Sequence, residues 1–128
     1  LIGEMRITGI LSKQYAGKAH AGTAHQLLRA ATQAGADALG RPDLGRLEAG
    51  AKADLHVFDL FKPHLQPVWD PVKNLLWKGH AGDIAFTMVQ GKPVVREGKL
   101  LTADEAAIMR TAAEGARKIW QLAAERKI

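Results

Sequence analysis

Five histidines have the widest chemical repertoire in this sequence, because imidazole binds metal ions and transfers protons near neutral pH. No two of them form a His-x-His pair or lie four residues apart on a helix, the spacings that direct two rings at one ion. We expect His56 to be packed or partly exposed within a strand. We expect His64 and His80 to be solvated loop residues with no acidic neighbour to orient either ring. The histidines are His20, His25, His56, His64 and His80.

The other reactive side chains form no catalytic pattern. The absence of cysteine excludes disulfides, zinc–thiolate sites, iron–sulfur clusters and cysteine nucleophiles. The sequence contains no Gly-x-Ser-x-Gly, P-loop or Gly-x-Gly-x-x-Gly motif. Asp54 and Asp59 lie at opposite ends of one predicted strand and Asp70 precedes Pro71 in a turn, so paired-carboxylate catalysis has no support. We therefore predict no catalytic residue and no metal ligand, and substrate-binding residues stay unknown.

Composition is that of an ordinary globular protein, with 47% hydrophobic and 24% charged residues among 128. The net charge of +5 comes from basic residues that are scattered along the chain, so we predict no nucleic-acid partner. Trp69, Trp77 and Trp120 have types that stack on bases, but core or loop-anchoring roles are favoured. No apolar run reaches the length of a membrane span, and we expect no membrane partner and a cytoplasmic location. A first residue of Leu1 suggests a piece of a longer protein.

The first third of the chain is predicted to be helical. Apolar spacing over residues 1–15 predicts one helix that ends near Gly17. A second helix begins at Thr23, which forms a capping box with Gln26. Gly35 is expected to supply its left-handed stop, and one further turn over residues 36–39 is closed by Gly40.

Short strands follow a glycine- and proline-containing connector over residues 41–52. Alternating residues predict a strand over 53–60, and residues 61–82 are expected to be a long irregular excursion. Further strands are predicted over 84–89, 93–96 and 99–101, with a tight hairpin turn at 90–92. Such a small sheet needs more strands or a covering helix.

The final segment, residues 102–128, is predicted to be an amphipathic helix. Thr102 and Glu105 suggest a capping box, and Asp104 adds negative charge to the first turn. Lys118, Arg126 and Lys127 place positive charge toward the other end. We expect the apolar stripe of this helix to cover one face of the sheet. The stripe consists of Ile108, Met109, Ala112, Ala113, Ala116, Ile119, Trp120 and Ala123.

Residues 44–55, with the sequence LGRLEAGAKADL, resemble the LG-x-LE-x-G-x-x-ADL stretch of the amidohydrolase superfamily. The resemblance covers residues 1 to about 109 and is most specific from 39 to 105. It favours the branch of S-adenosylhomocysteine and methylthioadenosine deaminases, with triazine chlorohydrolases close behind. Other matching motifs are Pro63-His64-Leu65-Gln66-Pro67-Val68, Asp70-Pro71-Val72, Asn74-Leu75-Leu76, Asp83, Val89-Gln90-Gly91-Lys92-Pro93-Val94-Val95, Glu97-Gly98-Lys99-Leu100-Leu101-Thr102 and Asp104-Glu105, with Glu4-Met5-Arg6 and residues 31–40 upstream.

The resemblance implies an α+β fold in three parts. Residues 1–40 would be the last helices of a (β/α)8 barrel. Residues 41–101 would be the C-terminal half of a small β-sandwich, and residues 102–128 the terminal amphipathic helix. Family members hold a divalent metal, zinc or iron, with a His-x-His on the first strand, further histidines on middle strands and an Asp on the last. None of these ligand motifs is in this sequence.

The resemblance therefore implies the C-terminal fragment of a metal-dependent hydrolase that acts on C–N or C–Cl bonds of heterocycles. We expect this chain to be a structural part, inactive alone and without a cofactor of its own. Its partner would be the missing N-terminal barrel portion. An alternative is an autonomous oligomerisation or binding module, derived from such an enzyme, that forms a homo-oligomer through exposed strand edges.

Overall fold

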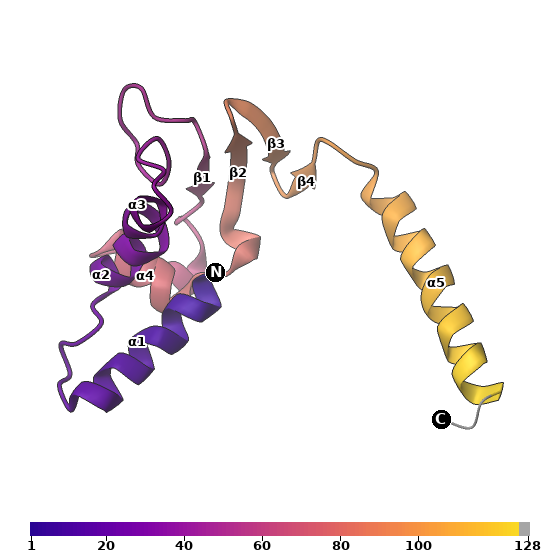
Figure 1. Cartoon of the computed structure of the whole chain (residues 1–128), viewed down its shortest axis with the longest axis horizontal. Helices are drawn as coiled ribbons and strands as arrows, with labels where there is room; N and C mark the ends of the chain where they lie inside the picture. The colour runs from indigo at the N-terminus through magenta and orange to yellow at the C-terminus, as the bar shows by residue number, and fades with distance from the viewer. Residues whose placement is uncertain (126–128) are drawn as a thin grey trace.

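The computed structural model describes residues 1–125 of the chain. Figure 1 shows the α+β arrangement: a cluster of helices built mainly from the first half, a small antiparallel sheet beside it, and one long helix at the other end. No helix in the described part of the chain is both long and apolar enough to cross a membrane.

The N-terminal helices begin as the sequence predicts. Helix α1 spans Ile2–Ala16 and ends at Gly17, whose φ of 59° lies in the left-handed region that glycine adopts without strain. Helix α2 spans Ala24–Arg29, and both bonds of its capping box form: Gln26 N donates to Thr23 Oγ1 at 3.3 Å and Thr23 N donates to Gln26 Oε1 at 3.0 Å. The capping box therefore sets the start of α2 locally.

The prediction that Gly35 stops this helix is wrong. Gly35 has φ −63° and is helical, and the chain continues through a π-helical segment η1 (Ala30–Ala34) into α3 (Gly35–Ala38). Alanine is the strongest helix former, and an alanine-rich run outweighs the cost of one glycine. The left-handed residue is Gly40, with φ 65°, which confirms the stop expected there.

The sheet has four antiparallel strands in the order β1-β2-β3-β4. The strands are β1 (Leu55–Phe58), β2 (Ile84–Val89), β3 (Lys92–Arg96) and β4 (Lys99–Leu100). Gln90 and Gly91 both have positive φ, as the tight hairpin turn between β2 and β3 requires. Because β1 and β4 end the strand order, each has a neighbouring strand on one side only within residues 1–125.

The segment 61–82 is not the irregular excursion that its prolines predict. It contains a 3₁₀ turn η2 (Pro63–Leu65) and helix α4 (Pro71–Lys78), and a second 3₁₀ turn η3 (Ala81–Asp83) follows. Asp70 caps α4, since its Oδ1 accepts from the backbone N–H groups of Val72 and Lys73 at 3.1 Å each. Proline at the first helical position is favourable, so Asp70-Pro71 was a helix-start signal.

Helices α1, α2 and α4 enclose the main apolar core. Its buried members are Met5, Ala24, Leu27 and Leu76. Arg6 of α1 ties the helices together, because its guanidinium donates to the carbonyl oxygens of Leu76 and Gly79 at the end of α4, each at 2.9 Å.

The terminal helix differs from expectation in two ways. Helix α5 spans Glu105–Glu125 and is capped by Asp104, whose Oδ1 accepts from the Ala107 N–H at 2.9 Å, so the predicted Thr102 capping box is wrong. The helix also does not cover the sheet: Figure 1 shows it standing clear, and none of its residues is buried. The predicted charges at Arg126 and Lys127 lie outside the described residues.

Candidate functional site

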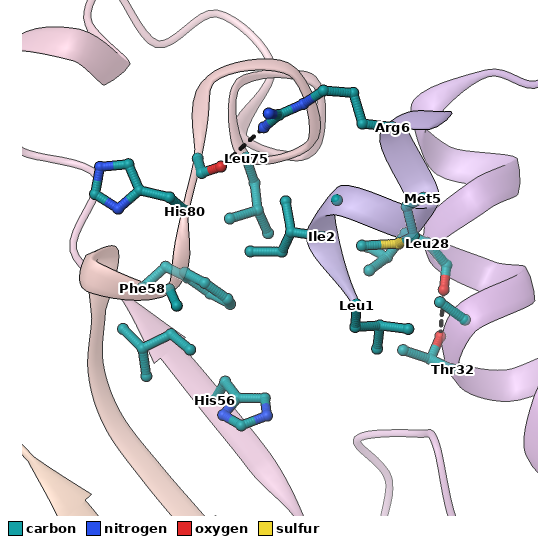
Figure 2. Close-up of a pocket in the computed structure, with 15 residues that line it drawn as sticks. Leu1, Ile2, Met5, Arg6, Leu28, Thr32, His56, Phe58, Leu75 and His80 are labelled. Carbon is teal, nitrogen blue, oxygen red and sulfur yellow. Dashed lines mark hydrogen bonds between the residues drawn. The ribbon is translucent and has the colours of Figure 1, made fainter. Parts of the chain in front are cut away.

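An apolar cavity of about 450 Å³ lies between the helical cluster and the sheet. Figure 2 shows Leu1, Ile2 and Met5 from the start of α1 on one side and His56 and Phe58 of β1 on the other. The polar side chains of the lining already have partners. Arg6 bonds the end of α4, and Thr32 Oγ1 donates to Leu28 O at 2.7 Å. The imidazole of His56 lies 2.9 Å from Thr87 Oγ1, and that of His80 lies 3.6 Å from an Asp83 oxygen. No carboxylate lines this cavity in the described part of the chain, so its surface suits packing of an apolar segment better than acid–base chemistry.

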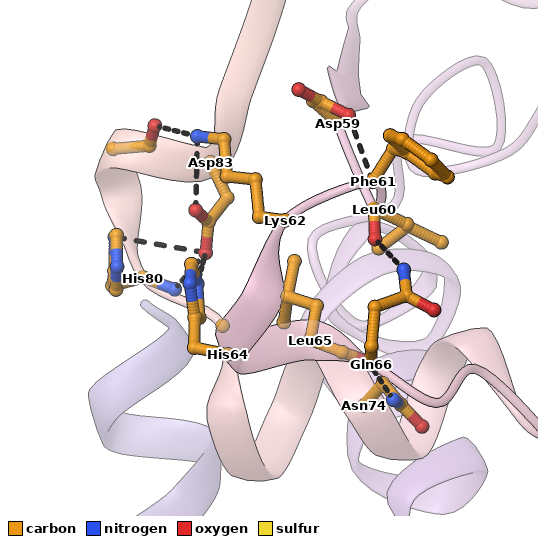
Figure 3. A network of polar contacts seen from close by, with 12 residues as sticks. Asp59, Leu60, Phe61, Lys62, His64, Leu65, Gln66, Asn74, His80 and Asp83 are labelled. Carbon is orange, nitrogen blue, oxygen red and sulfur yellow. Dashed lines mark hydrogen bonds and ion pairs between the residues drawn. The ribbon is translucent and has the colours of Figure 1, made fainter.

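A second feature is a polar network centred on Asp83, the last residue of η3 (Figure 3). The carboxylate of Asp83 is completely buried. Its Oδ2 lies 3.0 Å from His64 Nε2 and 3.6 Å from His80 Nδ1, and accepts from the His80 backbone N–H at 3.0 Å. Its Oδ1 accepts from Lys62 Nζ at 3.1 Å. One buried carboxylate thus organises η2, η3 and the residues before each turn.

The network keeps Asp83 ionised despite its burial. Burial by itself raises the pKa of a carboxyl group, because it penalises the charged form. Here the hydrogen bonds from the His64 ring, the His80 amide and the Lys62 ammonium outweigh that penalty, and they lower the pKa of Asp83 well below its usual range. The site therefore presents a negative charge to both imidazoles.

His64 and His80 correct the sequence prediction. Both had been expected to lack an acidic neighbour, yet both contact Asp83. Their rings also stack, with centroids 4.8 Å apart and planes at 12°. His64 is distant in sequence from Asp83 and gave no signal, but His80 and Asp83 are three residues apart, and the Asp83 side chain accepts from the His80 backbone N–H at the start of η3. That spacing could have indicated the contact.

The remaining candidate residues stay apart from this network. His56 lies in a strand as expected; its side chain is exposed, and its Nδ1 lies 2.9 Å from Thr87 Oγ1 across the sheet. His20 is exposed, and His25 Nε2 lies 3.7 Å from the capping carboxylate of Asp70. Asp54 and Asp59 each accept from a backbone N–H close to one end of β1, that of Gln90 and that of Phe61.

The tryptophans differ among themselves. Trp77 is 38% exposed and lies beneath Lys13 Nζ, which is 5.0 Å from its ring centroid. Trp69 and Trp120 are 91% and 74% exposed. The expected core or anchoring roles are therefore wrong for Trp69 and Trp120 within residues 1–125.

The amidohydrolase resemblance implies a catalytic metal, and the residues present do not match its ligand set. That set places ligands on barrel strands, whereas the described strands form one antiparallel sheet of four. The described residues bring together one group of three potential ligands, His64, His80 and Asp83, which lie on turns. No step of the family's chemistry is therefore assigned to residues of this chain.

Comparison with known proteins decides the family. The amidohydrolase family model matches residues 1–94, nearly three quarters of the chain. The chain belongs to the amidohydrolase family. This confirms the resemblance on which the sequence analysis rested.

Relatives of this amidohydrolase chain fall in both branches that the sequence pointed to. A 5-methylthioadenosine/S-adenosylhomocysteine deaminase of Halobacterium salinarum is 39% identical over 122 residues, which are 95% of this chain and 28% of the relative. The crystal structure of an adenosine deaminase from Xanthomonas campestris with bound zinc superposes with a TM-score of 0.88 and 33% identity, over 94% of this chain and 28% of that one. The zinc complex of an atrazine chlorohydrolase from Arthrobacter aurescens superposes with a TM-score of 0.80 and 29% sequence identity. The match covers 89% of this chain and 26% of that one.

The chain thus spans about 28% of the length of the curated relative, and it matches the C-terminal portion of such enzymes. The match to the zinc-bound adenosine deaminase extends over almost the whole described chain, α5 included for the most part. The small sheet and the helices around it are therefore an arrangement that a larger hydrolase also contains.

Proposed function

We propose that the chain is the C-terminal part of a metal-dependent hydrolase that cleaves a C–N bond, or a C–Cl bond, on a heterocycle such as an adenosine derivative. The observation that carries this proposal is 39% identity over 95% of the chain, to a deaminase of which the matched part is 28%. The zinc or iron of the enzyme would be held by the part that this chain does not include.

In this proposal the chain is scaffold. Residues 1–40 complete the barrel's last helices, residues 41–101 complete a sandwich, and the chain alone is inactive. Four surfaces of the structure support a partner of this kind: the outer edge of β1, the outer edge of β4, the apolar cavity beside Leu1 and Ile2, and the exposed apolar stripe of α5. Covering a strand edge or an apolar cavity with another segment lowers the free energy of the assembly, because backbone groups become paired and apolar surface leaves water.

Complementation tests this proposal directly. The Xanthomonas adenosine deaminase would be produced without its matching C-terminal portion and mixed, with zinc, with this 128-residue chain. We expect ammonia release from adenosine by the mixture and by neither component alone. The positive control is the same truncated enzyme mixed with its own missing portion.

Two outcomes would count against the proposal. Ammonia release by the pure chain would show that it carries a catalytic centre of its own. Failure to complement while the positive control succeeds would show that these surfaces do not fit the remainder of such an enzyme.

The alternative, a free-standing oligomerisation module, draws on the same exposed surfaces. Ile119 and Trp120 on α5 are 68% and 74% exposed, and a contiguous exposed apolar patch marks an interaction surface. Such a module would be a defined dimer or oligomer with a sharp, concentration-dependent melting transition. A monomeric chain at all concentrations would exclude it.

A further inference from the structure

Two stacked imidazoles lie against the buried carboxylate of Asp83, an arrangement that the scaffold role does not explain. Each carboxylate oxygen of Asp83 already accepts a hydrogen bond from a group other than an imidazole: Oδ1 from Lys62 Nζ, and Oδ2 from the His80 backbone N–H. Yet His64 and His80, sixteen positions apart, both turn a ring nitrogen toward the same oxygen of Asp83 (Figure 3). We propose that His64, His80 and Asp83 form a binding site for a divalent transition-metal ion of the zinc type.

The donor atoms are of the right kind. Zinc and its neighbours in the first transition row prefer imidazole nitrogen together with carboxylate oxygen, whereas magnesium and calcium prefer oxygen alone. A site with two imidazole nitrogens and one carboxylate oxygen therefore favours a zinc-type ion over magnesium or calcium. Three protein ligands leave a fourth position for water, and the His80 side chain, 62% exposed, lies at the solvent side of the cluster.

The donor atoms are also close to the right spacing. Ligand atoms bound to zinc at about 2.0–2.2 Å with tetrahedral angles lie about 3.4 Å from one another. Here the separations from Asp83 Oδ2 are 3.0 Å to His64 Nε2 and 3.6 Å to His80 Nδ1, and all the ligand atoms lie within 4.8 Å of one another. A tilt of the two stacked rings would direct the lone pairs of His64 Nε2 and His80 Nδ1 at one ion.

The surroundings hold the carboxylate for this purpose. The backbone N–H of Asp83 donates to His80 O at 3.0 Å. The backbone carbonyl oxygen of Asp83 accepts from the Asp59 N–H at 2.8 Å. Lys62 binds Oδ1 and leaves Oδ2 to the histidines, as an outer partner of a ligating carboxylate does. The Lys62 ammonium also repels a bound cation, so we expect affinity in the micromolar range, far weaker than that of structural zinc sites.

The test is titration of the full 128-residue chain with Zn²⁺ by isothermal calorimetry, and with Co²⁺ by visible absorption. We expect one ion per chain. His80→Gln should weaken binding at least about tenfold without unfolding the chain, because its side chain is exposed; His64→Gln should do the same. His20→Gln is the matched control, since it removes an exposed histidine outside the cluster and should leave the affinity unchanged.

Circular dichroism of each variant separates loss of a ligand from loss of the fold, and His80→Gln decides the matter if His64→Gln unfolds. Absence of saturable one-to-one binding would overturn the proposal. So would binding that His80→Gln leaves intact, or that His20→Gln weakens equally. Neither result depends on whether the chain complements a truncated deaminase.

Discussion

At the scale of single residues, contacts between near neighbours in sequence were open to prediction and those across the chain were not. The Thr23–Gln26 capping box formed as its spacing predicts, because both partners lie on one turn. The contact between His64 and Asp83 spans nineteen residues and depends on how η2 and η3 meet. No local pattern encodes that meeting. Residue types alone therefore made His64 look like a solvated loop residue.

The pair Arg41 and Asp43 gives a prediction about pH. Arg41 Nε and Nη2 each donate to a carboxylate oxygen of Asp43 at 2.8 Å, and this lowers the pKa of Asp43 to about 2. An unfolded chain has an aspartate pKa of about 3.9. Because the folded value is the lower one, the pair adds stability above about pH 4, and that contribution is lost as pH falls toward 2. Partial exposure of both side chains makes the effect small.

Urea unfolding of the wild type and of Asp43→Asn at several pH values between 2 and 6 measures this contribution. The two midpoints should converge as the pH falls from 4 to 2 and should stay a constant distance apart above pH 4. Arg41→Gln is the matched control, since it removes the other half of the pair and should flatten the same pH window. Parallel curves throughout would contradict the assignment.

At the scale of elements, local signals marked helix boundaries only in part, at starts and at ends alike. Two features of the sequence mark the start of α4: Asp70 supplies a capping side chain, and Pro71 occupies the first helical position. This start signal was overlooked because the prolines and glycines around it made the segment look irregular. Gly35 misled in the opposite direction, because a glycine stops a helix only where the backbone adopts positive φ, and Gly35 does not.

Gly9 and Gly3 on α1 provide a matched pair for packing between elements. A Cβ added at Gly9 would lie 2.8 Å from Leu27 Cδ1 and 3.3 Å from Trp77 Cη2, at the junction of α1 with α2 and α4, whereas one at Gly3 would meet nothing within 4 Å. Alanine improves helix propensity at either position. We expect Gly3→Ala to be neutral or slightly stabilising, and Gly9→Ala to lower the unfolding free energy by about 1–2 kcal/mol through overpacking.

Chemical denaturation followed by tryptophan fluorescence compares the two variants; of the three tryptophans, Trp77 is the least exposed and lies at this junction. The order of stability should be Gly3→Ala, then wild type, then Gly9→Ala. Equal stabilities of the two variants would mean that the three helices do not pack as closely as Gly9 requires.

At the scale of the whole molecule, the family was open to prediction and the placement of α5 was not. The LGRLEAGAKADL run and the hairpin after it carried the amidohydrolase assignment, which the family match over residues 1–94 confirms. The stripe of α5 was also evident, but an apolar stripe states only that a helix needs a covering surface. It does not say which surface, and within residues 1–125 the sheet is not that surface.

The separation of α5 leads to a prediction about the whole chain. Because no residue of α5 is buried, ending the chain after Leu101 should leave the midpoint of urea unfolding, followed by circular dichroism, unchanged. The same truncation should reduce self-association in sedimentation velocity, since it removes the exposed side chains of Ile119 and Trp120. Trp120→Glu in the full chain is the control that keeps the helix and interrupts its stripe, and it should also reduce association.

A fall in the midpoint on truncation would mean that α5 packs on the other elements in solution. Unchanged association would mean that the stripe is not where copies of the chain meet, and the strand edges of β1 and β4 would then be the surfaces to block.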